Sequence, residues 1–173
     1  MIDGHTHLSL AGDGRTYVEM FADSDEMMVL TGMMNLQQHL AAGITTIREH
    51  GARKKIGFTL KKGLARGYIA GPRLLASGRP ITCTRGHFHM CNEIADGEEQ
   101  MRRSVRRLIH EGAGYIKIMA SGGGTEGTIP GLASYWTGIL YNRRTACGCA
   151  QSASLSPPDS CPLSCQGING PCH

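Results

Sequence analysis

The chain has 173 residues with 40% hydrophobic and 18% charged residues, a composition typical of one globular domain. Its net charge of +4 and 5% aromatic content are too weak a signal for nucleic-acid binding, because the basic residues fall where helices would expose them. No apolar run reaches the roughly 18 residues of a membrane span, and the first residues lack a signal-peptide pattern, so we expect a cytoplasmic protein without a membrane partner.

Short apolar segments alternate with longer amphipathic segments from residue 1 to about residue 130. Four strands are expected from short apolar or β-branched runs, at 1–7, 44–48, 73–77 and 115–120. Three helices are expected from apolar residues at near-helical spacing, at 23–42, 54–70 and 96–111. In the first helix this spacing is carried by Met27, Leu30, Met34 and Leu40.

Strands that alternate with helices predict an α/β fold of parallel βαβ units. Two architectures fit, a doubly wound sheet and half of a (β/α)8 barrel, and a full barrel takes about 250 residues. We predict a partial TIM-type barrel of about four βα units over residues 1–132. Residues 133–173 have no convincing period and are rich in Cys, Ser and Pro, so we expect an irregular tail.

The segment Asp3-Gly-His-Thr-His7 carries two histidines two residues apart at the end of the first expected strand. Side chains at i and i+2 of a strand point to the same side, so both imidazoles can reach one ion. Neutral imidazole suits Zn²⁺ and similar metals. The alternative is a pair of exposed histidines at a strand end.

Lys117 lies within the apolar strand Tyr115–Ala120. Burying an ammonium is costly, and a buried lysine loses its proton easily, so its amine can add CO₂ and become an anionic carbamate that bridges two metals. Alternatively, the side chain reaches the strand end or pairs with a carboxylate.

A second His-x-His pair, His87 and His89, follows the third expected strand in a loop with a glycine. It is a candidate for contact with substrate at a barrel mouth, or it belongs to a surface loop. The glycine-rich loop 121–124 after the fourth strand is either part of the pocket or a flexible turn.

Four motifs in order resemble the amidohydrolase superfamily, in particular the branch of imidazolonepropionase-related enzymes and Xaa-Pro dipeptidases. They begin with Ile2-Asp-Gly-His-Thr-His7 and Leu40-Ala-Ala-Gly-Ile-Thr-Thr-Ile-Arg48. They continue with Gly71-Pro-Arg-Leu-Leu-Ala-Ser-Gly-Arg-Pro80 and Ile116-Lys-Ile-Met-Ala-Ser-Gly-Gly123. The resemblance covers residues 1 to about 130, the N-terminal half of such a barrel.

The resemblance implies a TIM-like barrel with up to two divalent metals, usually zinc. It implies that His5 and His7 hold one metal and that carboxylated Lys117 bridges both. The implied reaction is hydrolysis of a C–N bond by a metal-activated hydroxide, on a small-molecule or dipeptide-like substrate. His87 and His89 correspond to a loop near the substrate.

The sequence departs from the family pattern in two respects. Glu49 stands where the family usually has an aspartate, which is expected to affect a structural contact near the second strand. The family also has histidines on the fifth and sixth strands and a general-base aspartate on the eighth. After Lys117 this sequence contains one histidine, His173, and one aspartate, Asp159. The catalytic base is therefore unknown, and the chain is expected to be incomplete or inactive.

Three interpretations of the tail are open. It is an out-of-frame continuation, the tail of a truncated paralogue, or a zinc module built from the cysteines after residue 146 and His173. Two other classes of function also stay open. One is a non-catalytic half-barrel that binds metal or associates through its open edges, and the other is a small metal- or nucleic-acid-binding protein.

Overall fold

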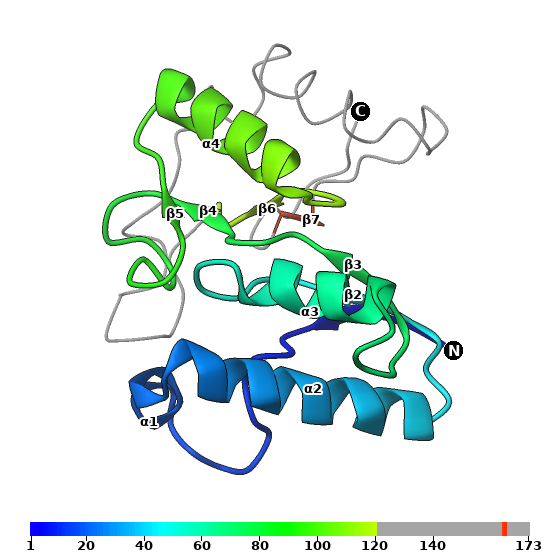
Figure 1. Cartoon of the computed structure of the whole chain (residues 1–173). Coiled ribbons are helices and arrows are strands. Elements are labelled where there is room, and N and C mark those ends of the chain that lie inside the picture. Colours follow the sequence, from blue (N-terminus) through cyan, green and yellow to red (C-terminus); the bar gives the residue numbers. More distant parts are fainter. Residues whose placement is uncertain (121–163, 166–173) are drawn as a thin grey trace. The chain divides into compact units, whose positions relative to one another are not determined.

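The computed structural model describes residues 1–120 and 164–165 of the chain, which divides into two compact units, 1–79 and 80–173 (Figure 1). The strands of the first unit are β1 (Ile2–Thr6), β2 (Thr46–Glu49) and β3 (Arg73–Ala76). Its helices are α1 (Tyr17–Ala22), α2 (Asp25–Ala41) and α3 (Ile56–Ala65). The second unit contains β4 (Ile81–Thr82), β5 (Glu93–Ile94), α4 (Glu98–Glu111), β6 (Lys117–Ile118) and β7 (Ser164–Cys165). Among the helices of the described residues, none is long and apolar enough to cross a membrane.

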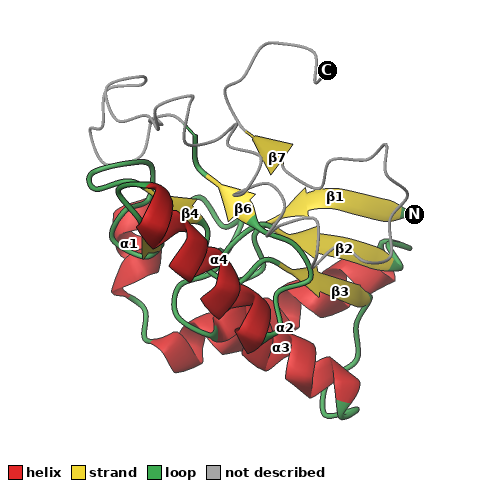
Figure 2. Cartoon of the chain, turned by 90° about the horizontal axis from the view of Figure 1, so that it is seen from above, coloured by secondary structure: helices red, strands yellow, loops and turns green. Residues whose placement is uncertain are grey.

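The first unit is a parallel sheet in the order β1-β2-β3, so neighbours in sequence are neighbours in the sheet. Helices α2 and α3 connect consecutive strands and lie along the same side of this sheet (Figure 2). The predicted parallel βαβ organisation is therefore confirmed for this unit. A doubly wound sheet reverses its strand order and places helices on both faces. Residues 1–79 show neither feature.

The single helix expected at 23–42 is confirmed as α2, and the short helix α1 precedes it as an additional element that the sequence analysis did not predict. Thr16 and Glu19 form a capping box at the start of α1, which the sequence reading missed. The Ser24 hydroxyl then accepts a hydrogen bond from the Met27 amide and begins α2. Asp25 follows Ser24 in the first turn, where the helix dipole favours a carboxylate.

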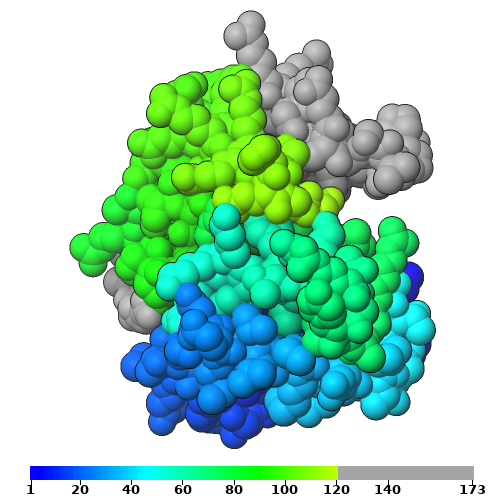
Figure 3. All heavy atoms as spheres, viewed as in Figure 1, coloured from blue at the N-terminus to red at the C-terminus, as the bar shows by residue number. Residues whose placement is uncertain are grey.

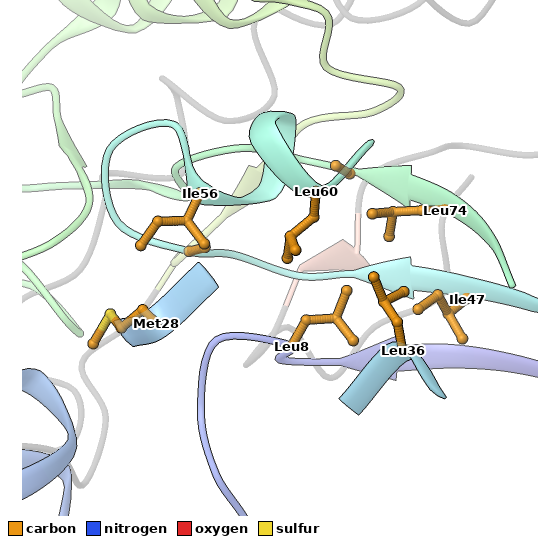
Figure 4. Packing of buried hydrophobic residues seen from close by; sticks show 9 residues of the cluster. Leu8, Met28, Leu36, Ile47, Ile56, Leu60 and Leu74 are labelled. Atoms are coloured by element: carbon orange, nitrogen blue, oxygen red, sulfur yellow. The ribbon is translucent and has the colours of Figure 1, made fainter. Parts of the chain in front are cut away.

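The core of the first unit lies between the sheet and helices α2 and α3, where side chains from α2, α3, β2 and β3 meet Leu8 and Ala52, which follow β1 and β2 (Figure 4). Its buried apolar residues are Leu8, Met28, Leu36, Ile47, Ala52, Ile56, Leu60, Leu74 and Ala76. The helices also form much of the outer surface of this unit, with α2 in blue in Figure 3. Burial of this apolar surface is the main stabilising contribution to the unit.

The buried face of α2 is not the one that the sequence pattern emphasised. Met28, Gly32 and Leu36 are buried at a spacing of four residues. The apolar residues that defined the expected helix are instead exposed, at fractions between 42% and 56%: Met27, Leu30, Met34 and Leu40. The pattern correctly indicated a helix, but apolar residues on both sides left its orientation undecided.

Gly32 marks the close approach of α2 to α3. A Cβ at this position would lie 2.5 Å from Cδ1 of Leu60, which is buried. We therefore expect Gly32→Ala to lower the free energy of unfolding by about 1 kcal/mol, because overpacking outweighs the gain in helix propensity. Urea denaturation of the full chain measures this change. Gln37→Ala on the exposed face is the control and should stay within about 0.5 kcal/mol of the parent, and a Gly32→Ala protein as stable as the parent would contradict the close packing.

The second unit is a parallel sheet in the order β5-β4-β6-β7. The sequence reading predicted the strand that contains β6 but missed β4 and β5, which have two residues each. Helix α4 agrees with the expected helix at 96–111, and its buried residues are Met101, Ser104, Val105 and Leu108. Within the expected tail only Ser164–Cys165 is described, and it pairs with β6 as β7. The rest of the tail and the loop 121–124 lie outside the described residues.

Candidate functional site

Strand β1 contains an irregularity that sets the direction of its polar side chains. Asp3 pairs with Ile47 and Thr6 pairs with Glu49, so three steps along β1 match two steps along β2. This is one extra residue in β1, the signature of a β-bulge. The Asp3 carboxylate accepts a hydrogen bond from the His5 amide at 3.0 Å, across the extra residue.

The structure brings the imidazoles of His5 and His7 together at the carboxyl end of β1. Their ring centroids are 5.4 Å apart and the ring planes are inclined by 58°. His5 is exposed and His7 is half-buried. The expectation that the two rings share one side is confirmed, and their role as metal ligands stays a prediction.

A third imidazole, which the sequence reading missed, joins them from the end of β2. His50 is 1% exposed, and its ring stacks on the His5 ring with centroids 4.1 Å apart and planes inclined by 16°. Its Nε2 donates a hydrogen bond to the Gly4 carbonyl oxygen at 2.8 Å, and its backbone amide donates to the Thr6 carbonyl oxygen at 2.8 Å. The feature of the sequence that could have identified His50 is its position directly after β2, a strand that pairs with β1.

The His7 ring is held by the residue after His50. Nδ1 of His7 lies 3.3 Å from the Gly51 carbonyl oxygen. A carbonyl oxygen only accepts hydrogen bonds, so Nδ1 carries the proton, and in the neutral ring the lone pair is on Nε2. A histidine that binds a metal through one nitrogen commonly donates from the other to such an oxygen. His7 therefore has the hydrogen bonding of a metal ligand.

Glu49 is fully buried at the last position of β2. Its Oε1 accepts a hydrogen bond from the Gly51 amide at 2.9 Å. A Cβ added to Gly57 in α3 would lie 2.9 Å from Glu49 Oε2, so the glycine makes room for the carboxyl group. Burial raises the pKa of Glu49 to about 8, and the hydrogen bond from Gly51 opposes this shift. The expected structural contact of Glu49 is thus with the Gly51 backbone.

Lys117 is 1% exposed in β6, and the residues on either side of it, Ile116 and Ile118, are also buried. It acts electrostatically on His87: burial, and then the positive charge of Lys117, lower the pKa of the His87 imidazole. Within the second unit, Lys117 in its charged form is therefore within electrostatic reach of His87.

The loop between β4 and β5 carries His87 and His89, both half-buried. Phe88 between them adopts a positive φ of 54°, an uncommon conformation for a bulky residue, and its ring lies 4.5 Å from the His87 ring. The Asn92 side chain donates to the His87 carbonyl oxygen at 3.2 Å. These contacts give the loop a defined conformation around His87.

The donor set divides between the two units. His5, His7 and His50 belong to the first, and Lys117 and His87 to the second, so the convergence of Lys117 with His5 and His7 stays a prediction. Within the described residues, no group of three or more His, Cys, Asp or Glu side chains is arranged to hold a metal ion. The described residues thus present a pair of imidazoles in the first unit and a buried amine in the second.

Parallel strands with polar side chains at their carboxyl ends define a class, the α/β folds whose ligand sites lie at that end of the sheet. Within that class, the profile of the amidohydrolase family matches residues 1–132. The chain belongs to the amidohydrolase family.

Individual relatives agree with this assignment. Ochratoxinase from Aspergillus niger is 34% identical in a match that covers 39% of this chain and 19% of that enzyme. The crystal structure of this ochratoxinase superposes on the chain with a TM-score of 0.73 at 25% identity. The crystal structure of a prolidase complexed with N-methylphosphonate-L-proline superposes with a TM-score of 0.70, also at 25% identity. A Xaa-Pro dipeptidase with methionine in its active site superposes with 0.70 at 21% identity, which is a likeness of fold.

The chain spans only part of these proteins. The superpositions cover 87–88% of this chain but 40% of ochratoxinase, of the prolidase and of the dipeptidase. The match in sequence spans about a fifth of ochratoxinase.

Proposed function

We propose that this chain carries part of the active site of a metal-dependent hydrolase that cleaves C–N bonds in dipeptide-like or other amide substrates. The observation that carries the proposal is the adjacent pair His5 and His7, with the His7 proton held on Nδ1 by Gly51. Membership of the amidohydrolase family and the names of the relatives, which include a prolidase and a Xaa-Pro dipeptidase, support the reaction class.

The proposal includes a partial TIM-type barrel that unites the strands of both units. The consecutive order β1-β2-β3 with both helices on one side supports it, because a barrel repeats this arrangement. In such a barrel His5 and His7 would bind one divalent metal, zinc by preference for imidazole. Carboxylated Lys117 would supply oxygen ligands to that ion and to a second one.

When bound, the metal polarises the substrate carbonyl and lowers the pKa of a water molecule. His5 and His7 would hold the ion, and His87 and His89 in the loop between β4 and β5 would contact the substrate. No acid–base residue is assigned in this chain, because the one histidine and the one aspartate after Lys117, His173 and Asp159, lie outside the described residues. We therefore propose that the chain binds metal and turns over substrate slowly.

Hydrolysis and metal content test the proposal together. The full chain is loaded with Zn²⁺, its metal content is measured, and cleavage of Xaa-Pro dipeptides and N-acyl amino acids is followed by release of amino acid. Metal binding at His5 and His7 with slow, metal-dependent cleavage is the expected result. Binding without cleavage would favour the alternative of a non-catalytic half-barrel, and absence of binding at these histidines would overturn the proposal.

Lys117 provides an independent prediction. Its amine is expected to attack CO₂, forming a C–N bond and losing one proton, because burial disfavours the ammonium form. Incubating the full chain with zinc and ¹³C-bicarbonate should give a carbamate carbon resonance that Lys117→Met abolishes. Lys62→Met, at an exposed position of α3, is the control and should keep the resonance. A resonance that survives in Lys117→Met would exclude Lys117 as its source.

A further inference from the structure

The segment Glu49–Gly51 at the end of β2 contacts both of the imidazoles at the end of β1. Three contacts join this segment to β1 and the residue after it. The His50 ring donates a hydrogen bond to the Gly4 carbonyl oxygen and stacks on the His5 ring, and the His7 ring donates a hydrogen bond to the Gly51 carbonyl oxygen. A fourth contact, from the Gly51 amide to Glu49, fixes the segment itself.

His50 compensates for the bulge in β1. Where the register between β1 and β2 shifts, one carbonyl group of β1 falls out of the regular ladder and needs another donor. The His50 ring supplies it to Gly4, at 2.8 Å. Because this hydrogen bond fixes the plane of the buried His50 ring, it also fixes the surface on which the exposed His5 ring stacks at 4.1 Å.

Glu49 acts one step further away, through Gly51. Gly51 has a φ of 136°, a conformation that side chains other than glycine rarely adopt, and its amide donates to the buried Glu49 carboxyl group at 2.9 Å. The Gly51 carbonyl oxygen belongs to the next peptide group, which is joined to this amide through the Gly51 Cα, and it lies 3.3 Å from His7 Nδ1. Fixing the amide at this φ therefore restricts where the carbonyl oxygen can lie. Gly57 provides the space that keeps the Glu49 side chain in place.

We infer that Glu49–Gly51 is a positioning element for the proposed metal site: His50 sets the plane of the His5 ring, and Glu49, through Gly51, sets the tautomer of His7. The inference rests on the proposed function, since positioning matters only if His5 and His7 bind a metal. Glu49 and His50 are positioning residues, because they act through His5 and His7. The structural consequence is a pair of imidazoles ordered before the metal arrives.

The first experiment reads the histidine tautomers without any metal. Two-dimensional ¹H–¹⁵N NMR of the full, metal-free chain with ¹⁵N-labelled histidine distinguishes protonated from unprotonated ring nitrogens. His7 is expected to carry its proton on Nδ1 and His50 on Nε2. A wild-type chain with the His7 proton on Nε2 would overturn the inference whatever the variants do.

The second experiment compares variants of Glu49. Glu49→Gln keeps an oxygen that accepts from the Gly51 amide, and it should leave the His7 tautomer and the zinc affinity unchanged. Glu49→Ala removes the acceptor, and it should give a mixture of His7 tautomers and a zinc affinity about 10- to 100-fold lower, the usual effect of losing an outer hydrogen bond of a metal site. Equal zinc affinities and tautomers in Glu49→Ala and Glu49→Gln would refute the role of Glu49.

Variants of His50 separate stacking from hydrogen bonding and provide a second route if Glu49→Ala does not fold. His50→Phe keeps an aromatic plane beside His5 but loses the donor to Gly4, whereas His50→Ala loses both. Zinc affinity should decrease in the order wild type, His50→Phe, His50→Ala, with the last at least about 10-fold weaker. If His50→Ala binds zinc as tightly as wild type, His50 has no positioning role.

The zinc-binding results distinguish failure of the proposed function from failure of the positioning inference. A wild-type chain that binds no zinc at His5 and His7 overturns both the proposed function and the positioning role that rests on it, even if the NMR experiment finds the expected tautomers. A wild-type chain that binds zinc at these histidines while the Glu49 and His50 variants bind it equally well overturns only the inference.

Discussion

Replacing His5 and His7 together with alanine is expected to lower the zinc affinity of the chain by at least about 100-fold, because loss of an outer hydrogen bond alone costs 10- to 100-fold and here both ligands are removed. The two rings are adjacent, with centroids 5.4 Å apart, so each single variant should already weaken binding. Titration of the full chain with Zn²⁺, followed by calorimetry, measures the effect.

Cysteines complicate this titration, because five of the seven lie after residue 146 and thiolates bind zinc tightly. Parallel titrations with Co²⁺ separate the two kinds of site, since thiolate ligands give charge-transfer bands that imidazole ligands do not. His110→Ala, an exposed histidine on α4, is the matched control and should bind as wild type does. Unchanged imidazole-type binding in the double variant would remove the main support for the proposed function.

Stability should fall as the pH rises, in a way that Glu49→Gln abolishes. Burial raises the pKa of Glu49 from 4.5 to about 8, so between these values the folded chain retains a proton that the unfolded chain has lost. The folded state then binds more protons than the unfolded state, and its free energy of unfolding decreases with increasing pH. The contribution of the protonated Glu49 to the free energy of unfolding is complete below pH 4.5 and is lost by about pH 8.

The shift corresponds to a loss on the order of 4 kcal/mol across this window. Other groups titrate as well, so the informative quantity is the difference in free energy of unfolding between Glu49→Gln and wild type, from urea denaturation at pH 5, 6, 7 and 8. This difference should increase with pH in favour of Glu49→Gln. Gln37→Ala, at an exposed position of α2 that carries no titrating group, is the control. A difference that does not vary with pH would show that Glu49 is ionised in the folded chain.

Much of the fold was predictable because it depends on local patterns. The expected strand at 73–77 and helix at 96–111 agree with β3 and α4 to within two residues. The expected helix at 54–70 is shorter in the structure, where α3 covers Ile56–Ala65. Apolar periodicity and turn residues determine such elements within a few residues of chain.

Elements that lack their own pattern were not predictable. Strands β4 and β5 have two residues each, too few for a period, and they form because neighbouring strands supply hydrogen-bonding partners. The orientation of α2 was also undecided, since apolar residues occur on both of its sides. Its packing was decided by Gly32, which lets Leu60 approach.

For the candidate site, the sequence by itself determined the family and the pairing of His5 with His7, because the periodicity of a strand is a local property. Only the tertiary structure decided which residues support that pair. His50 and Glu49 are more than 40 positions away along the chain, and they reach β1 through strand pairing and a bulge that no local pattern encodes. The supporting contacts are long-range, and long-range contacts exist only after the sheet has formed.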